Sequence, residues 1–378
     1  MKKISKKKLA QKNNYVIAVI LILLISAFSL VFSSTVPIQA QAADSILRPL
    51  IGEKNTLLLE SEYFGAQDKL NAMRYSLLGQ SAPVYSSVAS QKNIQVKNTN
   101  QMNLTNIPVP NSLKPLAEEG VWFPIAQNLY PGQEIIARTF IRPDLTHPYA
   151  IVSLVKMDMK KLSIGITAGT YYPGGYHHMY GPGTIPQNVL SQNLLLAAFN
   201  GGFQVRDGHY GMVVGGKTYV PLRTDMPLLA IYKDGSAGFI DYTGQALPVN
   251  VAAVRQNGPY LVKNGVITPY VEQGPDTWGR TTTNSMYTWR SGIGITKNGN
   301  LIYAVGNSLI PQSLSEALLK AGAVNAIQLD INPPWVRFIV YEGTGNGKYN
   351  FFPLLQSMTG GFNFLRGYNK DFFYIYKK

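Results

Sequence analysis

The chain has 378 residues, a formal net charge of +14 and only 14% charged residues. That length suffices for one large domain or two ordinary ones. The chain holds no Cys and four His, which excludes disulfide frameworks, cysteine–zinc and iron–sulfur sites, and a thiol nucleophile. Its 11% aromatic content and low charge also exclude a long disordered protein.

The N-terminus has the pattern of an export segment. Six Lys precede an apolar run at residues 15–32, and small residues at 40–42 predict cleavage before Ala43. Because the run is also long enough to cross a bilayer, residues 1–42 are either a signal peptide or an N-terminal membrane anchor. In both cases the remainder is exported, so we expect no nucleic-acid partner. The remaining positive charge favours an anionic cell-envelope polymer or a membrane surface.

Residues 43–118 are interpreted as a helical segment followed by a polar linker. Leu residues recur with helical spacing before position 80. Residues 80–111 are rich in Ser, Gln and Asn and show no long apolar periodicity, which is typical of a spacer. The main domain is therefore expected at 119–378.

Four glycine-containing turns predict β-hairpins in the main domain. Asn-Gly, Asp-Gly and Gly-Gly pairs supply the positive φ angles that tight hairpins need. These pairs are Gly215-Gly216, Asp234-Gly235, Asn264-Gly265 and Asn298-Gly299. An antiparallel core follows from them.

One segment departs from this hairpin pattern. After an apolar strand at 301–305, Ser313-x-x-Glu316 has the form of a capping box, and Gly322 is placed to end the helix. A buried strand at 324–329 then predicts a parallel strand–helix–strand crossover. The expected fold class is α+β, with mixed, largely antiparallel sheets, flanking helices and this one crossover.

Two polar residues follow apolar strands directly. Asn200 is followed by Gly201-Gly202, which would let a ligand approach the backbone amides, although a plain tight turn also fits. Asp330 would emerge at the carboxyl end of its strand, where ligands of α/β sheets bind. A carboxylate there must be solvated, paired or functional.

Other residues are candidates for binding a charged sugar. Arg290 suits bidentate capture of a phosphate, and the adjacent Trp289 could stack on a sugar, although a surface arginine is the alternative reading. The remaining candidates are loop or strand-end residues: His178, Asp207, Arg223 and Trp335. His177 and His178 are adjacent, and adjacent side chains of a regular strand point in opposite directions. We therefore expect no metal site formed by these two histidines. Asp and Asn oxygens near these candidate residues could hold Ca²⁺, but we expect no required cofactor.

Four motifs occur together in an order that resembles the phosphodiester glycosidase family. They are Asn200-Gly201-Gly202-Phe203, residues 258–265, Arg290-Ser291-Gly292-Ile293-Gly294, and residues 326–330. The resemblance covers about residues 130–378. It implies a phosphodiester glycosidase-like domain that hydrolyses a sugar-1-phosphodiester at the glycosidic bond, here in a phosphate-containing glycan of the cell envelope.

The resemblance also implies roles for three catalytic residues. Arg290 would neutralise charge on the phosphate, and Asn200 would orient sugar hydroxyls or water. Asp330 would stabilise an oxocarbenium-like state or act as nucleophile or base. Retention and inversion both stay open, with Asp207 the best second carboxylate.

The chain departs from the family pattern directly after Asp330. Residues 331–335 read Ile-Asn-Pro-Pro-Trp where the family has several Gly and a Ser, and Pro333 and Pro334 have no N–H to offer a phosphate. The alternative function is therefore a non-catalytic glycan-binding domain on the same fold. Trp289 and Trp335 would then form a surface for stacking sugars.

Overall fold

The computed structural model of the chain describes residues 66, 68–89, 102–125, 134–278, 287–331, 335–358 and 361–378. The expected export segment at 1–42 lies outside these residues. Within the described ranges, no helix combines the length and the apolar character needed to cross a membrane.

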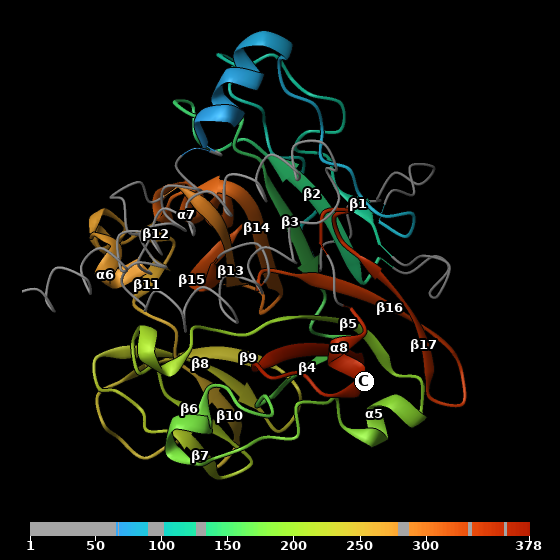
Figure 1. Ribbon diagram of the computed structural model, residues 1–378, viewed down its shortest axis with the longest axis vertical. Helices are drawn as coiled ribbons and strands as arrows, with labels where there is room; N and C mark the ends of the chain where they lie inside the picture. The colour runs from blue at the N-terminus through green and yellow to red at the C-terminus, as the bar shows by residue number, and fades with distance from the viewer. Residues whose placement is uncertain are drawn as a thin grey trace, which may run out of the picture.

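The largest of the three sheets has eight strands and occupies the middle of the molecule (Figure 1). Its strands, in spatial order, are β1 (Phe123–Pro124), β2 (Ile136–Ile141), β3 (Val152–Met157), β14 (Leu301–Leu309), β13 (Thr288–Thr296), β15 (Ala323–Ile331), β11 (Tyr260–Lys263) and β12 (Val266–Ile267).

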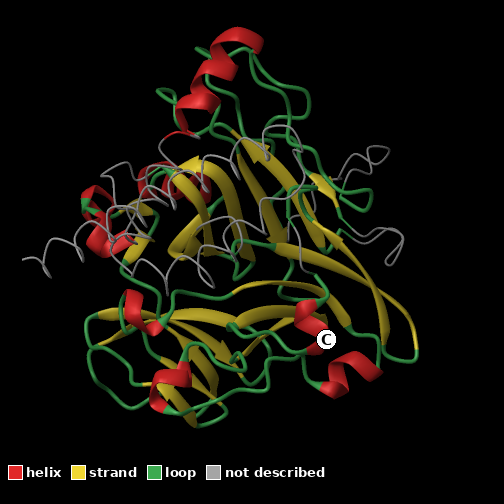
Figure 2. Cartoon of the chain, viewed as in Figure 1, coloured by secondary structure: helices red, strands yellow, loops and turns green. Residues whose placement is uncertain are grey.

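Two five-stranded sheets complete the β structure of the described residues. One has the order β17 (Lys348–Pro353), β16 (Phe338–Gly345), β5 (Leu195–Asn200), β18 (Phe372–Lys377) and β4 (Leu162–Thr167). The other has the order β7 (Lys217–Val220), β6 (Met212–Val214), β10 (Val251–Arg255), β8 (Met226–Tyr232) and β9 (Ala237–Tyr242). Figure 2 shows how strands dominate and short helices lie at the periphery.

The labelled helices are short apart from α7 (Pro311–Lys320). The others are η2 (Gly174–His177), α5 (Gln187–Ser191), η3 (Val205–Asp207), η4 (Pro269–Glu272), α6 (Pro275–Trp278) and α8 (Asn363–Arg366). This content agrees with the expected α+β class.

The predicted hairpins and the crossover are confirmed. The four turn pairs join β6 to β7, β8 to β9, β11 to β12 and β13 to β14, each as antiparallel neighbours. Strand β13 is antiparallel to both β14 and β15, so these two strands run parallel with β13 between them. Helix α7 joins them, as the sequence predicts.

The start of α7 differs from the expected capping box. Pro311 occupies the first helical turn and Ile310 is the N-cap, so Ser313 lies inside the helix. The Ser313 hydroxyl accepts a hydrogen bond from the Ile310 N–H at 3.0 Å. Glu316 accepts one from Gln312 at 2.8 Å instead of reaching back to the cap. Gly322, with φ of 99°, follows the helix as predicted.

The eight-stranded sheet buries both of its faces. On one face, Leu314 and Leu318 of α7 pack against strand residues such as Ala304. On the other face, a larger hydrophobic cluster joins this sheet to the five-stranded sheet that begins with β17 and ends with β4, called here the β17–β4 sheet. There the ring of Phe199 on β5 lies 5.0 Å from the ring of Tyr303 on β14. This packing fixes the ends of β5 and β15 relative to each other.

The segment expected to be a linker contributes to this core. Tyr85, Val88 and Ala89 are buried in the larger cluster, and Arg138 Nε donates to the Ala89 carbonyl at 2.7 Å. Residues 102–107 place three more buried side chains beneath the eight-stranded sheet. Residues 90–101 lie outside the described part. A polar spacer is therefore the wrong interpretation for 85–89 and 102–107, because the apolar side chains of these two stretches are removed from water.

Candidate active site

The ends of β5 and β15 meet through one hydroxyl group. Asn200, the last residue of β5, donates from Nδ2 to Ser291 Oγ at 2.9 Å, and Ser291 Oγ donates to the Asp330 carbonyl at 3.0 Å. The other end of the Asn200 amide accepts from the Tyr303 hydroxyl at 2.8 Å and from the Arg337 N–H at 3.1 Å. Asn200 is thus a buried connector between two sheets. Both predicted strand-end residues belong to one cluster.

The carboxylate of Asp330 is enclosed, with 3% of the residue exposed. Its Oδ1 accepts from the Ile331 N–H at 2.9 Å, and its Oδ2 pairs with the Nζ of Lys370. Burial raises the pKa of Asp330 to about 6, although the Lys370 charge acts to lower it. A carboxyl group with such a pKa changes charge within the range where acid–base and nucleophilic chemistry operate.

Lys370 is the cation of this cluster, and the sequence did not point to it. Its ammonium lies 4.5 Å from the centre of the Trp335 ring, in a cation–π contact. Burial acts to lower the pKa of Lys370, but the Asp330 carboxylate raises it above its usual value. Lys370 therefore stays protonated beside Asp330 and gives the cluster a positive centre.

The sequence predicts that the Gly201-Gly202 turn presents its backbone amides to a ligand. The structure shows instead that both amides bind Asp371. The Gly201 N–H donates to the Asp371 carbonyl at 3.0 Å, and the Gly202 N–H donates to Asp371 Oδ2 at 3.1 Å. A Cβ on Gly201 would lie 2.2 Å from Asp371 Oδ2, and one on Gly202 would lie 2.3 Å from Asn257 Oδ1. These glycines are required by close packing against Asp371 and Asn257.

A second buried ion pair, Arg255–Asp371, packs against this turn. Arg255 Nε donates to Asp371 Oδ2 at 2.9 Å, and Arg255 Nη2 donates to the Phe203 carbonyl at 2.7 Å. Asn257 accepts from the Phe203 N–H at 2.7 Å and donates to the Leu329 carbonyl at 2.7 Å. Together Arg255 and Asn257 hold the segment after β5 against the end of β15.

Arg290 lies in the core and not on a phosphate-facing surface. It is 0% exposed and donates to the carbonyls of Leu309 at 2.9 Å and Trp278 at 2.8 Å, and to Gln328 Oε1 at 2.7 Å. Burial lowers the pKa of Arg290 to about 9. The expected direct contact with a phosphate is not supported by this placement, because the guanidinium is committed to backbone oxygens.

The other predicted binding residues are scattered. Asp207 is exposed on η3, within 3.8 Å of Arg206. His178 is exposed after η2, and Trp289 is half-buried against the larger core cluster. Trp335 belongs to the cluster through Lys370, whereas residues 332–334 of the altered loop lie outside the described residues.

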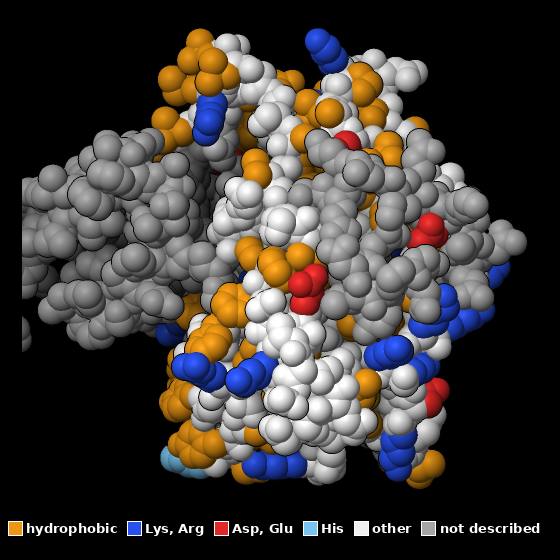
Figure 3. Space-filling view, turned by 90° about the vertical axis from the view of Figure 1, so that its right-hand side faces the viewer, with side chains coloured by type: hydrophobic (Ala, Val, Ile, Leu, Met, Phe, Trp, Pro, Cys, Tyr) orange, Lys and Arg blue, Asp and Glu red, His pale blue; other side chains and the backbone are white. Residues whose placement is uncertain are grey.

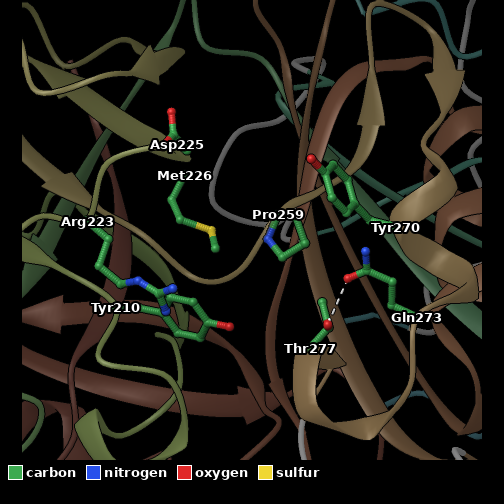
Figure 4. A pocket seen from close by; sticks show the side chains of 8 residues that line it. All are labelled: Tyr210, Arg223, Asp225, Met226, Pro259, Tyr270, Gln273 and Thr277. Atoms are coloured by element: carbon green, nitrogen blue, oxygen red, sulfur yellow. Dashed lines mark hydrogen bonds between the residues drawn. The ribbon is translucent and has the colours of Figure 1, made fainter.

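Arg223 lines a pocket of about 190 Å³. Figure 4 shows Tyr210, Arg223, Asp225 and Met226 on one wall and Tyr270, Gln273 and Thr277 on the other, with Pro259 between them. The Arg223 guanidinium lies 5.6 Å from the centre of the Tyr210 ring. Behind this wall, Tyr210 packs with Phe203 and Ile331 in one apolar cluster, and Ile331 follows Asp330 in the chain. The pocket offers aromatic faces and hydrogen-bonding groups, as sugar sites do.

No group of three or more His, Asp and Glu side chains in the described ranges is arranged to hold a metal ion. The Ca²⁺ expectation stays a prediction.

Several residues of the site escaped sequence reasoning. Lys370 and Asp371 lie directly before the apolar strand β18, Arg255 is the last residue of β10, and Asn257 lies two positions after it. Charged or amide residues at the boundary of an apolar strand were the available signal, the same one that pointed to Asp330.

The comparisons with known proteins give one family match. Residues 193–330 match the sequence profile of the phosphodiester glycosidase family, a stretch that starts just before β5 and ends at Asp330. This match confirms the family resemblance for that part of the chain. No curated protein sequence matches the chain.

Among solved structures, the chain is similar to the zebrafish N-acetylglucosamine-1-phosphodiester alpha-N-acetylglucosaminidase catalytic domain, auto-inhibited by its pro-peptide. The identity is 16% and the TM-score 0.42, over 66% of this chain and 86% of that one. It is also similar to a hypothetical protein from Synechocystis, at 12% identity and TM-score 0.36, over 66% of this chain and 63% of that one.

Proposed function

We propose that the chain is an exported hydrolase that cleaves a sugar-1-phosphodiester in a cell-envelope glycan. The observation that carries the proposal is the buried Asp330–Lys370 pair at the joined ends of two sheets. Asp330 is the last residue of the segment that matches the phosphodiester glycosidase profile. A carboxylate and an ammonium side by side suit a reaction in which a sugar becomes cationic while an anionic phosphate departs.

In this proposal Lys370 takes the role that the sequence assigned to Arg290. The bond between the anomeric carbon and the phosphate oxygen breaks, and its electron pair leaves with the phosphate monoester. Lys370 would neutralise charge on that phosphate, and Asp330 would stabilise the oxocarbenium-like sugar or attack it. Water supplies the hydroxyl group of the released sugar, and its other proton passes to the solvent. Asn200 and Arg290 would be positioning residues, because both donate to neighbouring protein oxygens.

The pocket beside the cluster would bind a sugar unit of the glycan. The Tyr210 and Tyr270 side chains line it together with an arginine, an amide and a hydroxyl. Planar polar groups beside aromatic rings match the alternating hydroxyl and C–H faces of a pyranose. Export rests on the N-terminal segment alone, and the anionic polymer partner rests on the net positive charge.

Turnover of a sugar-1-phosphodiester by the full chain, followed by detection of the released sugar, tests the proposal. Asp330→Asn and Lys370→Met are each expected to lower kcat by about 100-fold or more. Asp234→Asn is the matched control, because this exposed acid lies in the β8–β9 turn and Asn suits that turn. Full activity in both cluster variants would remove the pair from the mechanism.

A second candidate function, glycan binding without turnover, is favoured by a different observation. Asp330 and the Gly201 and Gly202 amides are all engaged by protein partners, whereas the pocket is open. In that case the full chain would bind an envelope polysaccharide saturably in titration calorimetry and release no product. Tyr270→Ala would weaken binding, and Tyr232→Ala, on the same domain outside the pocket, would not.

A further inference from the structure

The helix over residues 68–78 carries its apolar side chains on its outer face. Leu70, Met73, Leu77 and Leu78 are between 48% and 79% exposed. In an ordinary surface helix the apolar stripe faces the core and the polar residues face water. Here this arrangement is reversed.

The inner face of the helix is held by polar contacts. Asp68 Oδ2 accepts from the Tyr149 hydroxyl at 3.1 Å, and Asn71 Nδ2 donates to Ser308 Oγ at 3.2 Å. The Tyr75 ring lies 6.2 Å from the Tyr149 ring. These contacts fix the rotation of the helix about its axis, so the apolar face is turned outward by the fold.

The outer face also carries positive charge. Lys69 and Arg74 are exposed on the same helix. Figure 1 places the helix at one extreme end of the molecule, and Figure 3 shows hydrophobic side chains beside Lys and Arg at that end. An end that projects from the body can meet a flat surface without obstruction by the domain.

We infer that the outer face of this helix docks on an anionic membrane surface. Exposed apolar side chains flanked by Lys and Arg are the composition of helices that lie in a membrane interface. The sequence supplies the membrane: the run at 15–32 is long enough to span it, and residues 33–67 connect that run to the helix. Retained as an anchor, this run would give the helix a high effective concentration at the bilayer, so that few buried side chains would suffice.

This inference does not depend on the proposed function. It goes beyond anchoring by residues 1–42, because it assigns the body of the protein a fixed orientation on the bilayer. The end opposite the helix, where the β7–β9 sheet lies in Figure 1, would then face away from the membrane.

The absence of Cys allows a direct test. The full chain is reconstituted into vesicles of phosphatidylcholine and phosphatidylglycerol, with one cysteine introduced as Leu77→Cys and labelled with an environment-sensitive fluorophore. Val249→Cys is the matched control, because Val249 is an even more exposed apolar residue between β9 and β10. Residues 1–42 are present in both proteins, so only the position of the label differs.

Lipids brominated in their acyl chains should quench the label at position 77 by about twofold or more and leave the label at 249 unchanged. Quenching at 77 should weaken when phosphatidylglycerol is omitted. Absence of bromolipid quenching at position 77 would overturn the inference. If the label at 77 were also protected from aqueous iodide, protein and not lipid would cover this face of the helix. Equal quenching at both positions would also overturn the inference. Unchanged melting curves of both labelled proteins confirm that the fold is retained.

Discussion

The ammonium of Lys370 pairs with the carboxylate of Asp330 across the boundary between two sheets. Asp330 belongs to β15 of the eight-stranded sheet, and Lys370 precedes β18 of the β17–β4 sheet. The two side chains are 4% and 5% exposed. A pair so enclosed is strongly coupled to its surroundings, so its charge state affects both the chemistry of the site and the stability of the fold.

The first prediction concerns pH and stability. Burial raises the pKa of Asp330 from 3.8 to about 6, so the folded chain holds this proton more tightly than the unfolded chain does. The resulting stabilisation is fully present below about pH 4 and is lost as the pH rises through about 6. The free energy of unfolding of the unmodified chain should therefore decline between these values relative to that of Asp330→Asn.

Urea unfolding of the two proteins across this range measures the difference. Asp234→Asn serves as the control, because the pKa of this exposed acid is lowered by hydrogen bonds from Ser236 and not raised. A constant difference between the unmodified chain and Asp330→Asn would contradict the raised pKa.

The second prediction concerns Arg290. Arg290→Met removes the donors to the Leu309 and Trp278 carbonyls and leaves those buried oxygens without this partner. The free energy of unfolding should fall by about 3 kcal/mol. Lys297→Met, in the exposed turn after the same strand, should change it by no more than about 0.5 kcal/mol. If Arg290→Met left the free energy of unfolding unchanged and raised KM, Arg290 would have a direct role in binding the phosphate.

The third prediction concerns the glycine turn after β5. In Gly202→Ala the new methyl group would lie 2.3 Å from Asn257 Oδ1, an amide that holds β15. We expect a loss of about 1–3 kcal/mol in the free energy of unfolding, because the buried Asn257 and Arg255 side chains must move. Gly274→Ala is the control, since its added Cβ meets nothing within 4 Å. Thermal melts of the two variants that coincide would show that the turn tolerates a side chain.

The fourth prediction concerns the domain boundary. A chain that starts at residue 119 lacks Tyr85, Val88, Ala89 and the buried side chains of 102–107, all of which pack in the main clusters. Each large buried apolar side chain contributes about 1.5–3 kcal/mol, so the loss is comparable to the whole stability of a typical domain. Residues 119–378 should therefore show no cooperative unfolding transition, whereas residues 66–378 should unfold cooperatively. A sharp transition in the shorter chain would re-establish the boundary at 119.

Local chemistry was enough to determine much of this fold from the sequence. Each of the four hairpins depends on a glycine turn, and the crossover depends on a helix of ten residues between two apolar strands. Asn200 and Asp330 were found in the same way, because each is a polar residue at the end of an apolar strand. In every one of these cases the physical cause lies within a few neighbouring residues.

Only the tertiary structure decided what surrounds those two residues. Lys370 lies 40 positions from Asp330, Ser291 lies 91 from Asn200, and Asp371 lies 116 from Arg255. The structure likewise buried Arg290 and the supposed linker, and it turned the apolar face of the helix at 68–78 outward. A turn is set by the φ and ψ angles of its own residues, but burial and pairing depend on which distant strands pack together, and no local pattern encodes that choice.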